Sequence, residues 1–123
     1  MNSFLPLTVL AVTVAGGLGA VLRLVVGGVI QHRTGWSFPI GTMVINISGS
    51  FLLGLIMSAS DAAAGPTWIA IAGTGLMGGY TTFSTASVDT ADLLRGRKWS
   101  HAALYAGGTG FLSIAAAALG YSF

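Results

Sequence analysis

The sequence predicts an all-α membrane protein with four transmembrane helices. Of its 123 residues, 54% are hydrophobic and only 7% are charged, whereas a soluble domain typically carries about 25% charged residues. No charge precedes Arg23, and none lies between Arg33 and Asp61. The next charge after that is Asp89. Each uncharged stretch reaches the ~20 mainly apolar residues that span a bilayer core, so the composition excludes a water-soluble fold.

The first two predicted helices cover about residues 5–30 and 40–60. A polar stretch at residues 31–37, followed by Pro39, separates them. We expect the first segment to be a membrane helix and not a signal peptide. No basic residue precedes Arg23, and the apolar run is longer than the hydrophobic region of such a peptide.

The third and fourth predicted helices cover about residues 68–94 and 100–121, so residues 1–123 form a single membrane domain. Pro66 suits a helix start, and the basic stretch at residues 95–98 ends the third helix. Three tryptophans fall near predicted helix ends, where aromatic rings favour the headgroup layer; they are Trp36, Trp68 and Trp99. The apolar residues run continuously instead of alternating, which is atypical of a β-barrel.

Glycine is abundant, with 19 residues in the chain. Small residues four positions apart let membrane helices approach closely, because lipid supplies no hydrophobic drive for helix association. Such pairs occur in all four helices, at Gly16/Ala20, Ser50/Gly54, Gly75/Gly79 and Ala106/Gly110. Tight packing explains most of them, and four short helices leave enough surface that we expect the chain to oligomerise.

The third helix contains a segment, residues 78–85 with the sequence GGYTTFST, that is a poor helix centre. Non-helical backbone at membrane depth is tolerated only where it is buried in protein or lines water. Such a break frees carbonyl oxygens for a small cation and helix N-terminal N–H groups for an anion. The alternative is a kinked helix whose hydroxyl groups bond back to carbonyls one turn earlier.

Two polar stripes run along the second and fourth helices. Residues four apart share one helix face, and the stripes are Thr42, Asn46 and Ser50 on the second helix and Tyr105, Thr109 and Ser113 on the fourth. Hydroxyl groups and one carboxamide, with no embedded acid, suit an anion better than a proton or a metal cation. The alternatives are an interhelical hydrogen bond worth about 0.6 kcal/mol and hydroxyls bonded within their own helix.

The remaining polar residues lie near predicted helix ends. Arg23 either extends to the interface or lines a polar vestibule. Asp89 is placed to pair with a cation, and His32 and His101 are expected to be exposed. The sequence offers no nucleophile–base pair, phosphate loop or metal-site histidine cluster, so we expect no enzymatic activity.

The segment at residues 78–85 resembles the signature of the bacterial fluoride-channel family, Fluc, also called CrcB. The other matching positions are Gly19 with Arg23, Gly41 and Thr42 followed by Asn46, and Tyr105 with Thr109 and Ser113. The resemblance covers three of the predicted helices strongly and the first one weakly, with consistent order and spacing.

The resemblance implies a subunit of a passive, fluoride-selective channel that lets cytoplasmic fluoride escape and so reduces its toxicity. Family members lie in the bacterial plasma (inner) membrane as dimers of two oppositely oriented subunits, with two pores along the subunit boundary. The resemblance also implies a structural sodium ion at the dimer centre, which is not transported. Backbone carbonyls that match Gly78 and Thr81 would hold it.

For the pore, the resemblance assigns Asn46 as a hydrogen-bond donor to the anion. It assigns Phe83 as a ring whose positive edge faces the ion, a role consistent with the quadrupole of aromatic rings. Together with the two polar stripes, these assignments give a predicted fluoride pathway. Its members are Thr42, Asn46, Phe83, Ser84, Tyr105, Thr109 and Ser113.

Two positions depart from the family pattern. A second phenylalanine commonly lies three residues after the first, and this chain has Ala86 there. One aromatic wall of a pore is therefore missing from this subunit. The acidic position that follows is usually glutamate and is Asp89 here. Neither change removes the predicted sodium ligands, because those are backbone groups.

The basic residues are distributed on one side only. The loops after the first and third helices share one side of the membrane, and they hold Arg33, Arg95, Arg97 and Lys98. The positive-inside rule makes this side cytoplasmic and places both termini outside. A chain with one fixed orientation needs an oppositely biased partner for an antiparallel dimer, so we expect a heterodimer with a paralogous chain that restores the missing phenylalanine.

Two other functions compete with a conducting subunit. Ala86 keeps open a nonconducting or regulatory subunit that pairs with an active paralogue, because losing a pore-lining group can weaken conduction. A small four-helix multidrug exporter is also an antiparallel dimer, but it relies on a membrane-embedded carboxylate. This chain has no glutamate, and its aspartates lie at predicted segment ends.

Overall fold

The computed structural model describes residues 5–59 and 65–123, and every regular element in these ranges is helical. Three helices are long and apolar enough to span a membrane: α1 (Leu5–Thr34), α2 (Ile40–Ser58) and α6 (Trp99–Tyr121). The prediction of an all-α membrane protein is therefore confirmed at this level. Helix α1 continues beyond the predicted end at residue 30. The predicted end of the second helix at residue 60 lies outside the described residues.

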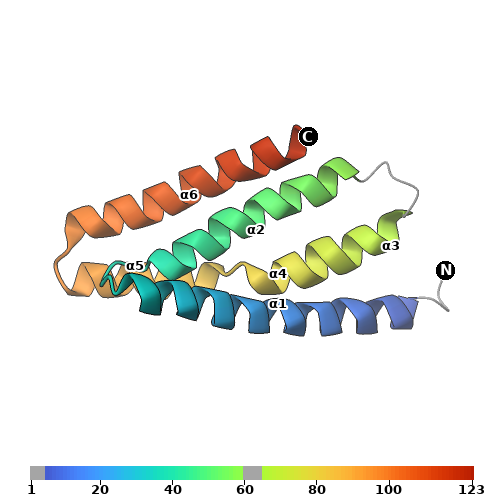
Figure 1. Cartoon of the computed structure of the whole chain (residues 1–123), viewed down its shortest axis with the longest axis horizontal. Helices are drawn as coiled ribbons and strands as arrows, with labels where there is room; N and C mark the ends of the chain where they lie inside the picture. The colour runs from blue at the N-terminus through green and yellow to red at the C-terminus, as the bar shows by residue number, and fades with distance from the viewer. Residues whose placement is uncertain (1–4, 60–64) are drawn as a thin grey trace.

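The third apolar segment consists of several helical pieces. It begins with α3 (Gly65–Ile69), continues as the π-helical η2 (Ala70–Met77) and the single turn α4 (Gly78–Tyr80), and resumes as α5 (Phe83–Arg95). These pieces follow one another along the length of α1 (Figure 1). No pattern in the sequence predicted the π-helical stretch, a rare form that is frequent at functional sites.

The chain leaves the helical conformation at two threonines. Thr81 has φ −79° and ψ 157°, and Thr82 has φ −149° and ψ 122°, so both are extended. The glycine pair before them stays helical. β-Branched residues favour extended backbone, which places the interruption at the threonines and not at the glycines.

Backbones approach closely at two helix contacts. Helix α2 packs mainly on α6, and α1 packs mainly on η2 and α4. A Cβ atom at Gly79 would overlap the carbonyl of Gly16 on α1, and one at Gly54 would overlap the carbonyl of Ala117 on α6. Gly110, by contrast, has open space beside it. Small residues therefore serve tight packing at the first two positions.

Two connections lie at one end of the molecule, opposite the end where α1 begins and α6 stops (Figure 1). They join α1 to α2 and α5 to α6. The Gln31 side chain holds the first connection: its Nε2 donates to the carbonyls of Trp36 and Phe38, at 2.7 and 2.9 Å. Its Oε1 accepts from the N–H of Gly41 at 2.9 Å. The half-buried Gln31 carboxamide thus fixes the entry into α2.

Candidate functional site

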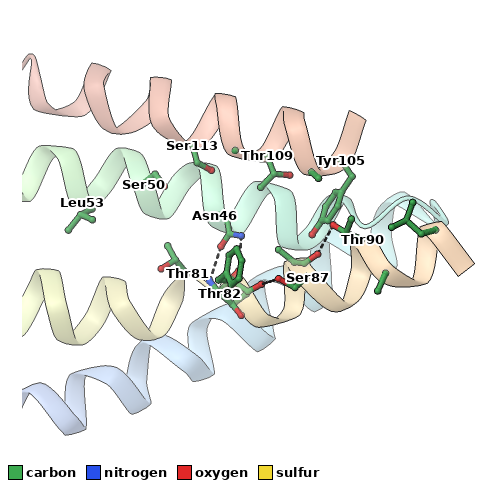
Figure 2. Close-up of a pocket in the computed structure, with 16 residues that line it drawn as sticks. Asn46, Ser50, Leu53, Thr81, Thr82, Ser87, Thr90, Tyr105, Thr109 and Ser113 are labelled. Atoms are coloured by element: carbon green, nitrogen blue, oxygen red, sulfur yellow. Dashed lines mark hydrogen bonds between the residues drawn. The ribbon is translucent and has the colours of Figure 1, made fainter. Parts of the chain in front are cut away.

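A groove of about 650 Å³ lies between α2, α5 and α6, beside the extended threonines (Figure 2). Five of the seven residues of the predicted fluoride pathway line it: Asn46, Phe83, Tyr105, Thr109 and Ser113. None of the described residues that line it carries a charge. The groove therefore presents neutral hydrogen-bonding groups on an otherwise apolar wall.

The Asn46 carboxamide forms two hydrogen bonds with one backbone residue, as Figure 2 shows. Its Nδ2 donates to the carbonyl of Thr82 at 2.9 Å, and its Oδ1 accepts from the N–H of Thr82 at 2.8 Å. A carboxamide nitrogen carries two protons, so one Nδ2–H remains after this pairing. Helix α2 thereby supplies the hydrogen bonds that the interrupted helix cannot make for itself.

The interruption also redirects the N–H groups that would close the next helical turns. In an unbroken helix, Thr82 and Thr85 would donate to the carbonyls of Gly78 and Thr81. Here the N–H of Thr82 is donated to Asn46, and the N–H of Thr85 is donated to the Thr82 hydroxyl at 3.2 Å. The carbonyls of Gly78 and Thr81 have therefore lost their helical donors. The Gly79 carbonyl accepts from Arg23 Nε at 3.3 Å.

Two buried hydroxyl groups in the groove have no hydrogen-bond partner among the described residues. They are Thr109 Oγ1 and Ser113 Oγ, which are buried on the face of α6 toward the groove (Figure 2). Other hydroxyls in the groove bond back within their own helix: Ser87 donates to Phe83 at 2.9 Å, and Thr90 donates to Ala86 at 2.8 Å. The alternative of back-bonding, left open by the sequence, therefore does not apply to the α6 pair.

Tyr105, whose side chain is fully buried, lines the groove from α6. Its hydroxyl donates to Asp89 Oδ2 at 3.3 Å, so the partner of Asp89 is a phenol and not the cation expected from the sequence. The Phe38 ring packs edge-on against the Tyr105 ring, with 5.5 Å between the two ring centroids. Ala86 packs against the same cluster and lines the groove beside it.

A second cavity of about 430 Å³ lies on the other side of the extended segment. Arg23 and Thr42 line it, together with Asp89 and Gln31. Thr42 is thus separated from the groove that holds Asn46, although the two share one helix. Thr82 lines both cavities, so the interruption forms the wall between them.

Two predicted pathway residues point outward from the chain. Phe83 is 87% exposed although it borders the groove. Ser84 is exposed and lines neither cavity. A phenylalanine with this exposure in an apolar chain is suited to contact lipid or a second subunit.

Comparison with known proteins identifies the family. The profile described as "CrcB-like protein, Camphor Resistance (CrcB)" matches residues 10–121. The chain belongs to the CrcB family. The family resemblance predicted from residues 78–85 is therefore confirmed.

Several CrcB relatives are named for fluoride. The chain is 53% identical over 116 residues to "Fluoride-specific ion channel FluC 1" of Leifsonia xyli, an alignment that covers 94% of this chain and 85% of the relative. It is 41% identical over 114 residues to "Fluoride-specific ion channel FluC" of Thermus thermophilus, covering 91% and 90%. It is 44% identical over 116 residues to "Fluoride-specific ion channel FluC 2" of Cutibacterium acnes, covering 93% and 94%.

In this CrcB chain, two site residues were missed from the sequence. Thr82 is both the backbone partner of Asn46 and the N-cap of α5, and a hydroxyl residue before a helical run is the usual signal for a cap. Gln31 holds the entry to α2, and no pattern in the sequence distinguishes it from an ordinary loop residue.

Proposed function

We infer that this chain is a subunit of a fluoride channel that lets the ion leave the cytoplasm passively. The unpaired hydroxyl groups of Thr109 and Ser113 carry the inference, because buried donors without partners suit a small anion. The remaining Nδ2–H of Asn46 adds a third donor in the same groove. The names of the relatives give the ion its identity.

We further propose that the third apolar segment, residues 65–95, also crosses the membrane and is interrupted at its middle. With α1, α2 and α6 this makes four crossings. The four helical pieces are consecutive and extend along α1 (Figure 1). The interruption is supported by α2 through Asn46 and by α1 through Arg23. Non-helical backbone at this depth requires such internal partners.

The proposed channel is an antiparallel dimer. Phe83 projects from the single chain, and the groove beside it is open. A second, inverted subunit would cover both, and the family resemblance points to this arrangement. We propose a paralogous chain as the partner, because Ala86 lacks the aromatic ring common at its position and the basic residues favour one orientation.

Sodium is the proposed structural ion at the dimer centre. The carbonyls of Gly78 and Thr81 fit this role, because their helical N–H donors are engaged elsewhere. Backbone carbonyl oxygens are suitable ligands for a hard cation. The ion would supply positive charge that holds the two interrupted segments together, while the anion path remains in the groove.

Reconstitution into liposomes tests the function. We expect fluoride efflux well above chloride efflux, from this chain with a candidate partner. This chain alone should give little flux if the partner is obligatory. Robust flux from the chain alone would refute the heterodimer. If replacing the Asn and Phe of the partner abolishes flux, while replacing Asn46 and Phe83 of this chain does not, this chain would be the nonconducting subunit. Equal fluoride and chloride efflux, or none in either sample, would refute the channel.

A further inference from the structure

Asn46 is the only described side chain that bonds both backbone groups of Thr82. It comes from α2, 36 positions away in the chain, so the pairing joins two separate helices. The two donor–acceptor distances, 2.9 and 2.8 Å, are those of well-formed hydrogen bonds. The Asn46 carboxamide bonds both the N–H and the carbonyl of Thr82. It therefore replaces the backbone hydrogen bonds that a regular helix would provide at this residue.

This pairing determines whether the Gly78 carbonyl, one turn earlier, accepts a helical hydrogen bond. Were the N–H of Thr82 free, its helical acceptor would be the carbonyl of Gly78. Asn46 Oδ1 takes that N–H instead. The Thr82 hydroxyl likewise takes the N–H of Thr85 and keeps it from the carbonyl of Thr81. The interruption is therefore maintained by side chains and not by the glycine pair, which is helical.

We propose that Asn46 is a positioning residue: its carboxamide holds Thr82 in the extended conformation, prevents the helix from closing and so keeps the Gly78 carbonyl available. Its second Nδ2–H stays directed to ligands in the groove. This role adds a structural basis to the proposed channel function. Only its flux measurements depend on that function. The backbone geometry can be tested separately.

The chain offers a specific probe of this backbone. Thr81–Thr82 is the only pair of adjacent threonines in the sequence. A chain labelled with carbonyl-¹³C,¹⁵N-threonine therefore gives a single carbonyl–nitrogen correlated NMR signal, from the Thr82 amide. We expect Asn46→Leu, which is similar in size and lacks both hydrogen-bonding groups, to shift this signal. Ser50→Ala, one turn along the same groove-facing side of α2, should leave the signal in place.

The Asn46→Asp variant adds a pH-dependent test. A neutral carboxyl group has one donor and one acceptor, as the Thr82 pairing requires, whereas a carboxylate only accepts. We expect fluoride flux to fall about tenfold at neutral pH, since one bond is lost and a negative oxygen faces the Thr82 carbonyl. As pH falls and the carboxyl group regains its proton, the NMR signal should return and flux should recover in part. Recovery is partial because the neutral carboxyl group pairs with Thr82 but lacks the second donor of the carboxamide. Protein-free liposomes correct for leakage of hydrogen fluoride.

The outcomes separate the two proposals. A shifted Thr82 signal in Asn46→Leu, with joint recovery of signal and flux in Asn46→Asp, supports the positioning role. An unshifted signal in Asn46→Leu refutes it, and lost flux would then mean that Asn46 acts on the ion alone. If the wild-type assembly carries no fluoride while the Thr82 signal responds as expected, the positioning role stands and the channel function fails.

Discussion

At the scale of single residues, the decisive feature is a pair of buried hydroxyl groups without partners. Burying a polar group without a hydrogen bond costs about 1–3 kcal/mol. Several hydroxyls of this chain avoid that cost by donating to a carbonyl of their own helix, as Thr13 does to Val9 at 2.8 Å. Thr109 and Ser113 do not. Their cost is offset only when a ligand accepts from them, which is what a fluoride ion would do.

This contrast gives a prediction for Thr109→Val, which removes the hydroxyl and keeps the shape. We expect fluoride flux to fall about tenfold, because one hydrogen bond to the anion is lost. The free energy of unfolding in detergent should rise by about 1 kcal/mol or stay unchanged, because an unpaired group is removed. Thr13→Val on the outer face of α1 is the matched control, with unchanged flux. A destabilised Thr109→Val chain would instead indicate a structural hydrogen bond.

At the scale of helices, α1 holds the interrupted segment by direct backbone contact. A Cβ at Gly19 would overlap the backbone of Leu76 and Tyr80. Arg23, one turn further on, donates to the Gly79 carbonyl. Because backbone atoms cannot move aside as side chains do, this contact admits only glycine. Helix α1 therefore positions the segment before the threonines, while α2 positions the threonines themselves.

Gly19→Ala and Gly17→Ala test this contact on the same helix. Gly17 has nothing within 4 Å of an added Cβ. We expect Gly19→Ala to lower the free energy of unfolding by about 2 kcal/mol, as overpacking does. Gly17→Ala should raise it slightly, by up to about 1 kcal/mol, because alanine favours helix. Equilibrium unfolding in detergent measures both. Equal effects would show that α1 does not contact η2 and α4 closely.

At the scale of the whole molecule, the basic residues and the exposed apolar residues lie on different surfaces. The two connections at one end of the molecule (Figure 1) are flanked by basic residues. Arg33 and Arg95 lie in the last turns of α1 and α5, and Arg97 and Lys98 lie between α5 and α6. Most of the exposed large apolar residues belong to α1 and α6, among them Val14 and Phe111, and others lie on α2 and α5. One end is therefore suited to the cytoplasmic surface, and the sides are suited to lipid and a partner subunit.

The orientation can be measured with single cysteines, because the chain has none of its own. We expect a membrane-impermeant maleimide to label Ser122→Cys in intact cells and to leave Ser37→Cys unlabelled until the membrane is opened. The reason is that Ser37 lies in the connection beside the basic residues, whereas Ser122 follows α6 at the other end. Similar labelling of both in intact cells would indicate dual insertion and remove the charge argument for a heterodimer.

The two polar stripes differ in how far helical spacing predicts their surroundings. Four-residue spacing correctly indicated that Tyr105, Thr109 and Ser113 share a face, and all three line the groove. The same spacing placed Thr42 with Asn46, yet Thr42 lies in the second cavity. Helical periodicity fixes which residues share a face, but neighbouring elements divide that face into separate cavities. Here the division is made by Thr82.

By itself, the sequence determined the helical membrane character, the family and the location of the interruption to within a few residues. These follow from local properties: charge spacing, hydropathy and the poor helix propensity of two threonines after two glycines. Only the tertiary structure decided that Asn46 bonds Thr82, that Gly78 and Thr81 lose their helical donors, and that Thr109 and Ser113 keep free hydroxyls. Hydrogen bonds between residues far apart in the chain depend on how helices pack, and no local pattern encodes that packing.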